Sequence, residues 1–398
     1  MSAAMDISRS PRILLYSHDS VGLGHLRRSL TLASSLAETM PGASMLLATG
    51  SDAALRFELP EGLEVVKLPS VGKSEDGSYC SRRLPGGLPS LVRIRRAILM
   101  QLVETHRPDL LIVDHKVLGV AEELEPVLAR MKEIGGLSIL GVRDVIDEPA
   151  VVAREWGSAK IRHALIESYD AVCVYGSEQV YDLRQECPMP PELAKRLQYT
   201  GFVVRPMNGL AYPPLPRLKD LVLVTTGGGE DGAERIESYL DMIEQSRPQW
   251  ESMIVFGPLL DAVRRRQLKR RARVLEGVSV HSFYEDLPRL LADSSAVVAM
   301  AGYNTVVEIM RSRVPALLLP RTTPRKEQLI RARRVAELGF AECLVEPTVD
   351  RMRMAVESCL SRGRFQGPMP SLDGASAFSD VVCQMLGREA VRSGGETI

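Results

Sequence analysis

The stretch from residue 294 to residue 329 constrains the fold most, because it joins short strand-like runs directly to helix starts. Residues 296–300 form an apolar, partly β-branched run that predicts a buried strand. Ala301–Gly302 breaks this run, and Asn304–Thr305 offers N-cap side chains for a helix that ends near Arg311. A helix that starts at a strand end presents unbonded N–H groups and the positive end of its dipole, which favours a phosphate.

The same unit then repeats. Residues 316–319 predict the next buried strand, and Thr323 and Pro324 predict the N-cap and first residue of another helix. Two parallel strand-to-helix turns side by side make a crevice of the kind in which α/β proteins bind nucleotides. Glu308 has a second explanation, because Thr305-x-x-Glu308 matches a capping box in which the carboxylate only bonds back to the cap. The spacing leaves both roles open.

Residues 301–308 (Ala-Gly-Tyr-Asn-Thr-Val-Val-Glu), followed by Arg-Lys-Glu-Gln at 325–328, resemble the donor-binding signature of GT-B glycosyltransferases. The similarity is greatest to the branch that contains the UDP-GlcNAc-using lipid II synthase. The resemblance implies that a glycine turn and helix start hold the nucleotide diphosphate, a glutamate binds the ribose hydroxyls and a glutamine contacts the donor sugar. The residues in these roles are Ala301, Gly302, Asn304 and Thr305, then Glu308, then Gln328, with Glu327 where the family has a second acid or glutamine.

Two further segments of the second half fit the same resemblance. Residues 220–225 predict a strand, and Gly227, Gly228 and Gly229 follow it, so that backbone N–H groups can approach a phosphate closely. A plain flexible turn is the alternative. The family has a serine after these glycines, where this chain has Glu230. Phe283 and Tyr284 follow a predicted strand at 278–281, and the resemblance makes them candidate uracil contacts, with ordinary core packing as the alternative.

In the first half, residues 12–17 predict a buried strand, and a glycine-containing loop leads to a helix that begins near His25. A dinucleotide site is rejected, because the loop lacks the third glycine and no acidic residue ends a clear second strand about 20 residues later. Gly-x-Gly-His-x-x-Arg at 22–28 is similar instead to the first glycine loop of the same GT-B branch, where the histidine faces the cleft between domains. Gly22 and Gly24 therefore belong to the acceptor side.

His25 is the candidate general base, since an imidazole with an ordinary pKa of about 6.5 accepts a proton at neutral pH. Phosphate or acceptor binding and a structural role are its alternatives. His18 is a weaker candidate for the same place, and Asp19 could orient either ring. Asp144 ends a predicted strand and is the carboxylate alternative to His25, although an ion pair with Arg143 would also explain it.

Asp114–His115 also stands at a strand end, where α/β sites are built, but loop capping would explain Asp114. The segment 70–89 is long for a connection, which is typical of a lid or binding loop. By the resemblance it faces the acceptor.

Alternation of strands and helices predicts parallel sheets covered on both faces. The expected fold class is α/β of the GT-B type, with two Rossmann-like domains facing across a cleft and a C-terminal helix crossing back to the first domain. The expected parts are an acceptor-side domain (11–204), a proline-rich linker (205–217), a donor-binding domain (218–374) and the crossing helix (375–391).

Composition narrows the partners. The 398 residues carry zero net charge, which argues against a general nucleic-acid binder. Six cysteines show no CxxC or metal-ligand spacing, so we expect reduced thiols in a cytoplasmic protein. No apolar run approaches the roughly 18 to 20 residues of a membrane span. Residues 264–273 contain seven cations, which predicts a solvated face or a contact with an anionic membrane or acidic partner.

The predicted function is inverting transfer of a sugar from a nucleotide donor, which we expect to be UDP-linked, to a hydroxyl acceptor. No metal site is expected, because no Asp-x-Asp at a strand end and no His/Cys cluster is present, and no cofactor is expected beyond the donor as co-substrate. The alternatives are a nucleotide-sugar hydrolase of the same fold, in which His25 activates water, and a non-catalytic nucleotide-sugar-binding module. We expect a cytoplasmic protein, and a peripheral position at the inner face of the membrane stays open.

Overall fold

The computed structural model describes residues 9–18, 23–73, 79–205, 220–229, 231–284 and 286–387. The chain divides into two compact units, Met1–Arg205 with Asp373–Ile398 (unit 1) and Pro206–Leu372 (unit 2). Of the predicted linker only Arg205 belongs to the described part. Asp19, Gly22 and Glu230 also lie outside the described residues.

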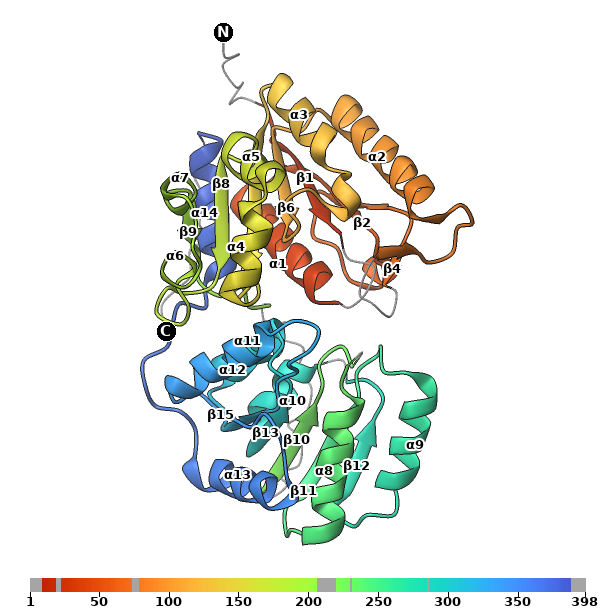
Figure 1. Ribbon diagram of the computed structural model, residues 1–398, viewed down its shortest axis with the longest axis vertical. Helices are drawn as coiled ribbons and strands as arrows, with labels where there is room; N and C mark the ends of the chain where they lie inside the picture. Colours follow the sequence, from red (N-terminus) through yellow and green to blue (C-terminus); the bar gives the residue numbers. More distant parts are fainter. Residues whose placement is uncertain are drawn as a thin grey trace. The chain divides into compact units, whose positions relative to one another are not determined.

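Unit 1 contains a parallel sheet whose described strands have the order β3-β2-β1-β6-β7-β8-β9. Its central strands are rich in Ile, Leu and Val and are buried apart from the end residues of β1 and β7, as expected for a sheet covered on both faces (Figure 1). The strands are β1 (Arg12–Ser17), β2 (Ser44–Thr49), β3 (Leu63–Lys67), β6 (Leu110–Asp114), β7 (Leu137–Arg143), β8 (Ala171–Tyr175) and β9 (Leu197–Tyr199). A separate antiparallel pair joins β4 (Val71–Lys73) and β5 (Tyr79–Ser81), within the segment predicted as a binding loop.

The last helix of the described chain, α14, belongs to unit 1 and packs on the first helix, α1. Ser379 Oγ of α14 lies 2.8 Å from Ser35 Oγ of α1, and the Phe378 ring lies edge-on to Tyr175 of β8. The predicted return of the C-terminal helix to the first domain is therefore confirmed. The helices are α1 (Gly24–Thr39), α2 (Gly87–His106), α3 (Glu125–Glu133), α4 (Pro149–Gly157), α5 (Ala159–Glu167), α6 (Leu183–Glu186), α7 (Pro191–Ala194) and α14 (Gly374–Met385), with short 3-10 turns at Ala54–Arg56 and Val120–Glu122.

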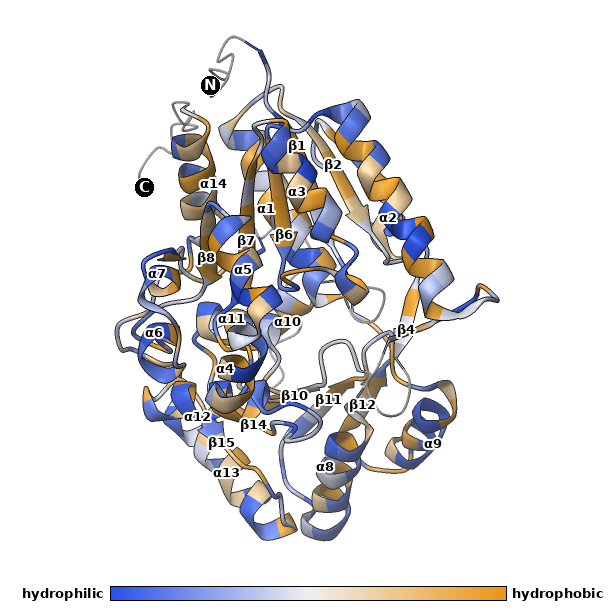
Figure 2. Ribbon diagram, turned by 45° about the horizontal axis from the view of Figure 1, so that its top comes forward, coloured by the Kyte–Doolittle hydropathy of each residue, from blue (hydrophilic) through white to orange (hydrophobic). Residues whose placement is uncertain are grey.

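Unit 2 contains a second parallel sheet, with the order β12-β11-β10-β13-β14-β15 among the described strands. Figure 2 shows the strands of both sheets mainly in apolar colours and the outer sides of the helices mainly in polar ones. The strands are β10 (Leu221–Thr225), β11 (Glu251–Val255), β12 (Val278–His281), β13 (Ala296–Ala299), β14 (Ala316–Leu318) and β15 (Glu342–Cys343). The helices are α8 (Ala233–Ser246), α9 (Ala262–Ala272), α10 (Leu287–Asp293), α11 (Tyr303–Ser312), α12 (Glu327–Glu337) and α13 (Val349–Arg362).

The strand order reverses at one place in each sheet. In unit 1, β1 lies between β2 and β6, and in unit 2, β10 lies between β11 and β13. Chain connections leave such a pair of strands in opposite directions, so a crevice opens beyond their carboxyl ends. Ligands bind doubly wound sheets at this switch point, which makes the loops after β1 and β6, and after β10 and β13, the places to look for function.

Two predicted helix starts are wrong. Helix α11 begins at Tyr303, with Gly302 as N-cap in an extended conformation, so Asn304–Thr305 lies inside the first turn. Helix α12 begins at Glu327 with Lys326 as N-cap, and Thr323–Pro324 precedes it as a cis peptide. In both cases the N-cap residue makes no capping side-chain bond. At α11 the extended backbone of Gly302 leads from the end of β13 directly into the helix.

Candidate active site

Three histidines meet at the switch point of unit 1. His18 directly follows β1, His115 directly follows β6, and His25 lies in the first turn of α1, as predicted for the start of that helix. The ring centroid of His25 lies 4.7 Å from that of His18 and 5.2 Å from that of His115. The sheet topology therefore brings together residues that are about 90 positions apart in the chain.

Asp114, the last residue of β6, orients His25. Its Oδ2 lies 2.5 Å from Nδ1 of His25, while its Oδ1 accepts hydrogen bonds from Nη2 (2.6 Å) and Nε (3.1 Å) of Arg28. The same Nδ1 also lies 2.8 Å from Nη2 of Arg28, which can only donate, whereas a carboxylate only accepts. We assign the proton of the neutral imidazole to Nδ1 because its contact with Asp114 is the shorter of the two. The Nε2 atom of His25 is then left as a proton acceptor.

The charges and burial of this cluster set its protonation. Burial lowers the pKa of His25 to about 4, although the adjacent Asp114 carboxylate opposes the shift. Burial alone would raise the pKa of Asp114, but the charges of Arg28 and His25 hold it well below its ordinary value. At neutral pH the pair is thus a neutral imidazole bonded to a carboxylate, the arrangement of a general base with its orienting group.

Sequence reasoning undervalued Asp114, and the structure removes the explanation that it only caps a loop. Its carboxylate oxygens contact the side chains of His25 and Arg28, and its side chain is 5% exposed. The one feature that could have pointed to this role is that Asp114 ends β6, the strand that pairs with β1. That pairing is known only from the sheet topology. Asp144, the predicted carboxylate alternative, is fully buried beside Gly176, whereas the side chain of His25 is 16% exposed. Access to a substrate therefore favours His25.

At the switch point of unit 2 the site consists mainly of backbone. Gly302, the N-cap of α11, has no side-chain capping bond, and open space surrounds the position that a Cβ atom would take there. The first backbone bond of the helix runs from Val306 N–H to the Gly302 carbonyl at 3.0 Å. The N–H groups of the preceding first turn have no partner within an α-helix, so they form the kind of site that binds a phosphate.

The glycine loop after β10 lies beside this helix start. Gly227 has a left-handed backbone (φ +64°), and a Cβ atom placed on it would lie 3.2 Å from Oγ1 of Thr305. The N–H of Gly227 donates to Thr225 Oγ1 (3.3 Å), and the N–H of Gly229 donates to the Thr226 carbonyl (3.2 Å). Two of the three glycine N–H groups expected to face a phosphate are thus bonded within the loop. The start of α11 is the stronger source of donors.

Glu308 does not form a capping box. With Gly302 as N-cap, the third helical position is Thr305, and Glu308 is the sixth residue of α11. The capping explanation that the sequence left open is therefore wrong for this helix. Glu308 is half-buried on the same helix as the donor-binding turn, and its predicted ribose contact stays a prediction.

Two arginines that sequence reasoning missed hold the turns around this site. Arg331 of α12 is fully buried, and its Nη1 donates to the carbonyl of Ala301 at 2.9 Å. Arg321 forms ion pairs with Glu327 (2.6 Å) and with Asp231, which follows the glycine loop. The guanidinium of Arg321 thus links the start of α12 to the end of the glycine loop. Glu327, the neighbour of the candidate sugar contact Gln328, is engaged in this ion pair.

Gln328 and the two aromatic candidates differ in how available they are. Gln328 is 9% exposed, and its Oε1 accepts from the backbone N–H of Arg321 at 3.4 Å. Phe283 is 51% exposed, so the core-packing explanation is wrong for it, while the ring of Tyr284 lies edge-on to His281. An exposed aromatic ring beyond β12 suits a base-stacking role, which stays a prediction.

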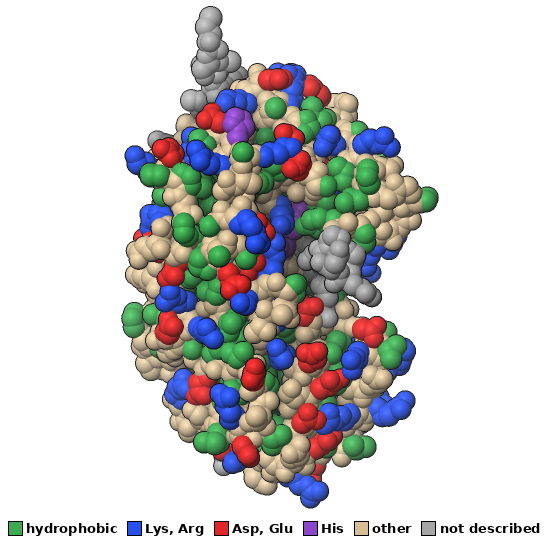
Figure 3. Space-filling view, in the orientation of Figure 1, with side chains coloured by type: hydrophobic (Ala, Val, Ile, Leu, Met, Phe, Trp, Pro, Cys, Tyr) green, Lys and Arg blue, Asp and Glu red, His purple; other side chains and the backbone are tan. Residues whose placement is uncertain are grey.

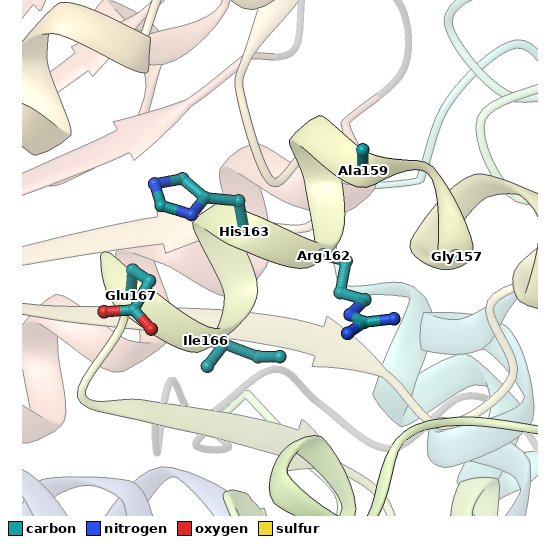
Figure 4. A pocket seen from close by; sticks show the side chains of 6 residues that line it. All are labelled: Gly157, Ala159, Arg162, His163, Ile166 and Glu167. Atoms are coloured by element: carbon teal, nitrogen blue, oxygen red, sulfur yellow. The ribbon is translucent and has the colours of Figure 1, made fainter.

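A pocket lies on the surface of unit 1, and none of the predicted site residues lines it. Figure 4 shows that it follows α5 and the turn before it, lined by Gly157, Ala159, Arg162, His163, Ile166 and Glu167. Nearly all of its lining comes from one helix, and we assign no ligand to it. Within the described ranges no cluster of three or more His, Cys, Asp or Glu has metal-site geometry, and no helix there is long and apolar enough to cross a bilayer.

Residues 221–384 match the glycosyltransferase family 28 C-terminal domain, a range that begins at β10 and contains the whole candidate donor site. The chain resembles the GT-B glycosyltransferases. A UDP-N-acetylglucosamine transferase of Nitrobacter winogradskyi, which acts on N-acetylmuramyl-(pentapeptide) pyrophosphoryl-undecaprenol, is 27% identical over 44% of this chain and 49% of its own length. An uncharacterized glycosyltransferase of Methanosarcina acetivorans is 23% identical over 93% of this chain and 97% of its own length.

Among solved structures, the glycotransferase of kitacinnamycin superposes with a TM-score of 0.61 and 18% identity, covering 96% of both chains. The predicted GT-B fold and the predicted resemblance to the lipid II synthase branch are therefore confirmed. The chain matches between about a fifth and a half of the length of the first four curated relatives. The similarity of fold, in contrast, extends over nearly the whole chain.

Proposed function

We propose that this protein is a glycosyltransferase that moves a sugar from a UDP-linked donor, with UDP-GlcNAc as the first candidate, to a hydroxyl acceptor with inversion at the anomeric carbon. Unit 2 binds the donor and unit 1 supplies the base. In this proposal the reaction uses no metal and no cofactor beyond the donor. The protein is located in the cytoplasm. The observation that carries it is the His25–Asp114 contact at one switch point, together with the uncapped start of α11 at the other.

In the proposed reaction, Nε2 of His25 takes the proton of the acceptor hydroxyl as its oxygen attacks the anomeric carbon. The bond between that carbon and the phosphate oxygen breaks on the opposite face, and the nucleoside diphosphate leaves. Asp114 stabilises the imidazolium that forms, because its carboxylate lies 2.5 Å from Nδ1. The N–H groups at the start of α11 stabilise the charge that develops on the leaving diphosphate.

The first test is calorimetric titration with UDP, UDP-GlcNAc, UDP-glucose and a GDP-sugar. We expect UDP compounds to bind, and we expect Glu308→Gln to weaken their binding roughly 10- to 100-fold, because charge-assisted bonds to the ribose hydroxyls are lost. Glu337→Gln is the matched control, since Glu337 is an exposed carboxylate of α12. If no UDP compound binds, or if both variants bind equally well, the donor site is misplaced.

The second test measures UDP release with and without candidate hydroxyl acceptors. A transferase releases UDP in proportion to the glycosylated acceptor that forms. A hydrolase releases the same amount without any acceptor, because water takes the place of the hydroxyl at His25. Binding without release under any condition would support the non-catalytic alternative.

A further inference from the structure

Unit 1 buries two arginines, each beside a carboxylate. Figure 3 shows Lys and Arg side chains spread over one face of the molecule, which is the ordinary place for a cation. The side chains of Arg28 and Arg95 are instead only 2% and 0% exposed, and they pair with Asp114 and Glu123. Because a buried guanidinium is costly unless its charge and hydrogen bonds are matched, its partners indicate its role.

The partners of Arg95 belong to the framework of unit 1. Arg95 of α2 donates to both carboxylate oxygens of Glu123, at 2.7 and 2.6 Å, and to the carbonyl of Pro69 at 2.8 Å. Tyr16 of β1 donates to the same carboxylate at 2.5 Å. These contacts join α2 to the central sheet and to the chain before β4. They include no predicted site residue, so this pair is a structural reference for the other one.

The partners of Arg28 are the candidate base and its orienting carboxylate. Nε and Nη2 of Arg28 donate to Oδ1 of Asp114 at 3.1 and 2.6 Å, and Nη2 also lies 2.8 Å from Nδ1 of His25. The other carboxylate oxygen, Oδ2, lies 2.5 Å from the same Nδ1. Because two N–H groups of one planar guanidinium hold Oδ1, the carboxylate loses both bonds if it rotates. Oδ2 therefore stays directed at the imidazole.

Tyr175, the last residue of β8, supports this guanidinium. Its side chain is fully buried, and Cζ of Arg28 lies 5.3 Å from the centre of its ring, within the range of a cation–π contact. A Cβ atom at Gly141 of β7 would lie 1.9 Å from the Tyr175 hydroxyl oxygen, so the ring fills the space that a side chain at 141 would need. Gly141 pairs with Asp114 in the sheet. The glycine thus lets a residue of β8 reach across β7 to the arginine.

We propose that Arg28 is a positioning residue for the candidate base and that Tyr175 is its support. The inference rests on the proposed function, because the reacting group that Arg28 positions is His25. Arg28 fixes the orientation of the Asp114 carboxylate, and its positive charge beside the imidazole disfavours an additional proton there. One residue thereby keeps the base both directed and neutral.

Several groups besides Arg28 influence the charge of the imidazole. The charged and titratable groups around this cluster come from α1, β6, β7 and the turns after β1 and β6: Arg28, Asp114, Arg143, His18, His115 and Lys116. Burial has the largest effect and lowers the pKa of His25 to about 4, while the Asp114 carboxylate opposes the shift. Of the cations, Arg28 lowers this pKa more than Arg143 does. Replacement of Arg28 by a neutral residue should therefore raise the pKa of His25.

The first measurement is an NMR titration of histidine-labelled protein, in which the His25 signal is assigned by its absence in His25→Ala. We expect His25 to titrate near pH 4 in the unchanged protein and at clearly higher pH in Arg28→Gln. Arg28→Lys should stay close to the unchanged protein, because it keeps the charge. Arg95→Gln is the matched control, since it also removes a buried guanidinium from a carboxylate, and it should leave the pKa of His25 unchanged.

The second measurement is turnover, which separates orientation from charge. Arg28→Lys and Arg28→Gln should both lower kcat roughly 10-fold, because neither side chain has the planar fork that grips the carboxylate, while UDP affinity stays unchanged. Only in Arg28→Gln should the acid limb of kcat/KM also move to higher pH. Tyr175→Leu should lower kcat as well, whereas Tyr175→Phe keeps the ring and should retain most of it.

Three results overturn the proposal: an equal pKa of His25 in Arg28→Gln and the unchanged protein, an equal rise in Arg95→Gln, or full turnover of Arg28→Lys. If circular dichroism shows that Arg28→Gln is unfolded, the turnover of Arg28→Lys and of Tyr175→Leu decides. The NMR titration needs no substrate, so it tests the role of Arg28 even if the unchanged protein transfers no sugar. Absence of transfer with every donor and acceptor would overturn the proposed function instead.

Discussion

The two units have the same strand order around their switch points, yet they place different chemistry there. After β1 and β6, unit 1 positions side chains, among them His18 and Asp114, which meet His25 of α1. After β10 and β13, unit 2 positions glycines, Gly227 and Gly302, beside a helix start. The comparison teaches that the topology fixes where a ligand can bind, while the residue types in the loops decide which chemistry is available.

The difference extends to how each site should respond to change. In unit 1 the reacting groups are buried side chains whose pKa values depend on one another, so removal of one charge alters the others. In unit 2 the proposed donors are backbone N–H groups, which do not titrate and which no substitution other than proline removes. Substitutions in unit 1 should therefore affect turnover, and substitutions in unit 2 should act through backbone geometry and donor affinity.

The largest expected effect follows from removal of the candidate base. His25→Ala should lower turnover by about a thousandfold, in the range that general-base catalysis contributes, while UDP affinity stays unchanged. Steady-state kinetics with saturating donor and titration with UDP measure the two quantities. His163→Ala, at an exposed histidine of α5, is the control and should keep full turnover. Turnover of the His25 variant close to that of the unchanged protein would exclude the imidazole as base.

A smaller loss is expected when the orienting carboxylate is neutralised. Asp114→Asn should lower turnover by about a hundredfold, because an amide no longer fixes the proton on Nδ1 or stabilises the imidazolium. Asp109→Asn is a suitable control, since Asp109 is also a buried carboxylate that pairs with an arginine, Arg9, but it precedes β6 at the opposite end of the sheet. Equal losses in both variants would mean that only stability has been measured.

The pH dependence sharpens the comparison next. A base must be neutral, and lowering its pKa extends the neutral form to lower pH, so kcat/KM should begin to fall only near pH 4. At pH 5 an imidazole of ordinary pKa would already have lost about thirtyfold of its neutral form. A profile of kcat/KM from pH 4 to 8, with circular dichroism to exclude acid unfolding, measures this. An acid limb near pH 6.5 would show that His25 is solvated during the reaction.

The architecture could be predicted because it depends on local patterns. Buried runs such as 12–17 and 296–300 alternate with helical spacing, and the motif 301–308 is compact in sequence, so fold and family resemblance followed from contiguous residues. What the sequence did not reveal depends on residues far apart in it. The contact of Asp114 with His25 spans 89 positions, and the bond from Arg331 to Ala301 spans 30.

The errors at helix starts have a related cause. Asn304 and Thr305 are good N-cap residues by type, but the extended backbone at Gly302 begins α11 earlier than side-chain preference predicts. Propensity describes one residue, whereas the end of β13 and its neighbours set the direction in which the chain leaves the sheet. The same applies to the glycine loop, whose N–H groups at Gly227 and Gly229 are bonded within the protein.

The smallest expected effect tests the backbone character of the unit 2 site. Gly227→Ala forces a side chain onto a left-handed residue 3.2 Å from Thr305 Oγ1, so unit 2 should lose about 1 to 2 kcal/mol of stability. Gly339→Ala is the matched control, because Gly339 is also left-handed (φ +81°) and follows α12.

Urea unfolding should show a similar loss for both glycine variants, whereas titration with UDP should show weaker binding for the Gly227 variant alone. The reason is that only Gly227 lies beside the first turn of α11, where a displaced Thr305 would alter the N–H groups proposed to bind phosphate. If both variants keep the same UDP affinity, the glycine loop does not shape the donor site. The backbone site of unit 2 would then be confined to the helix start.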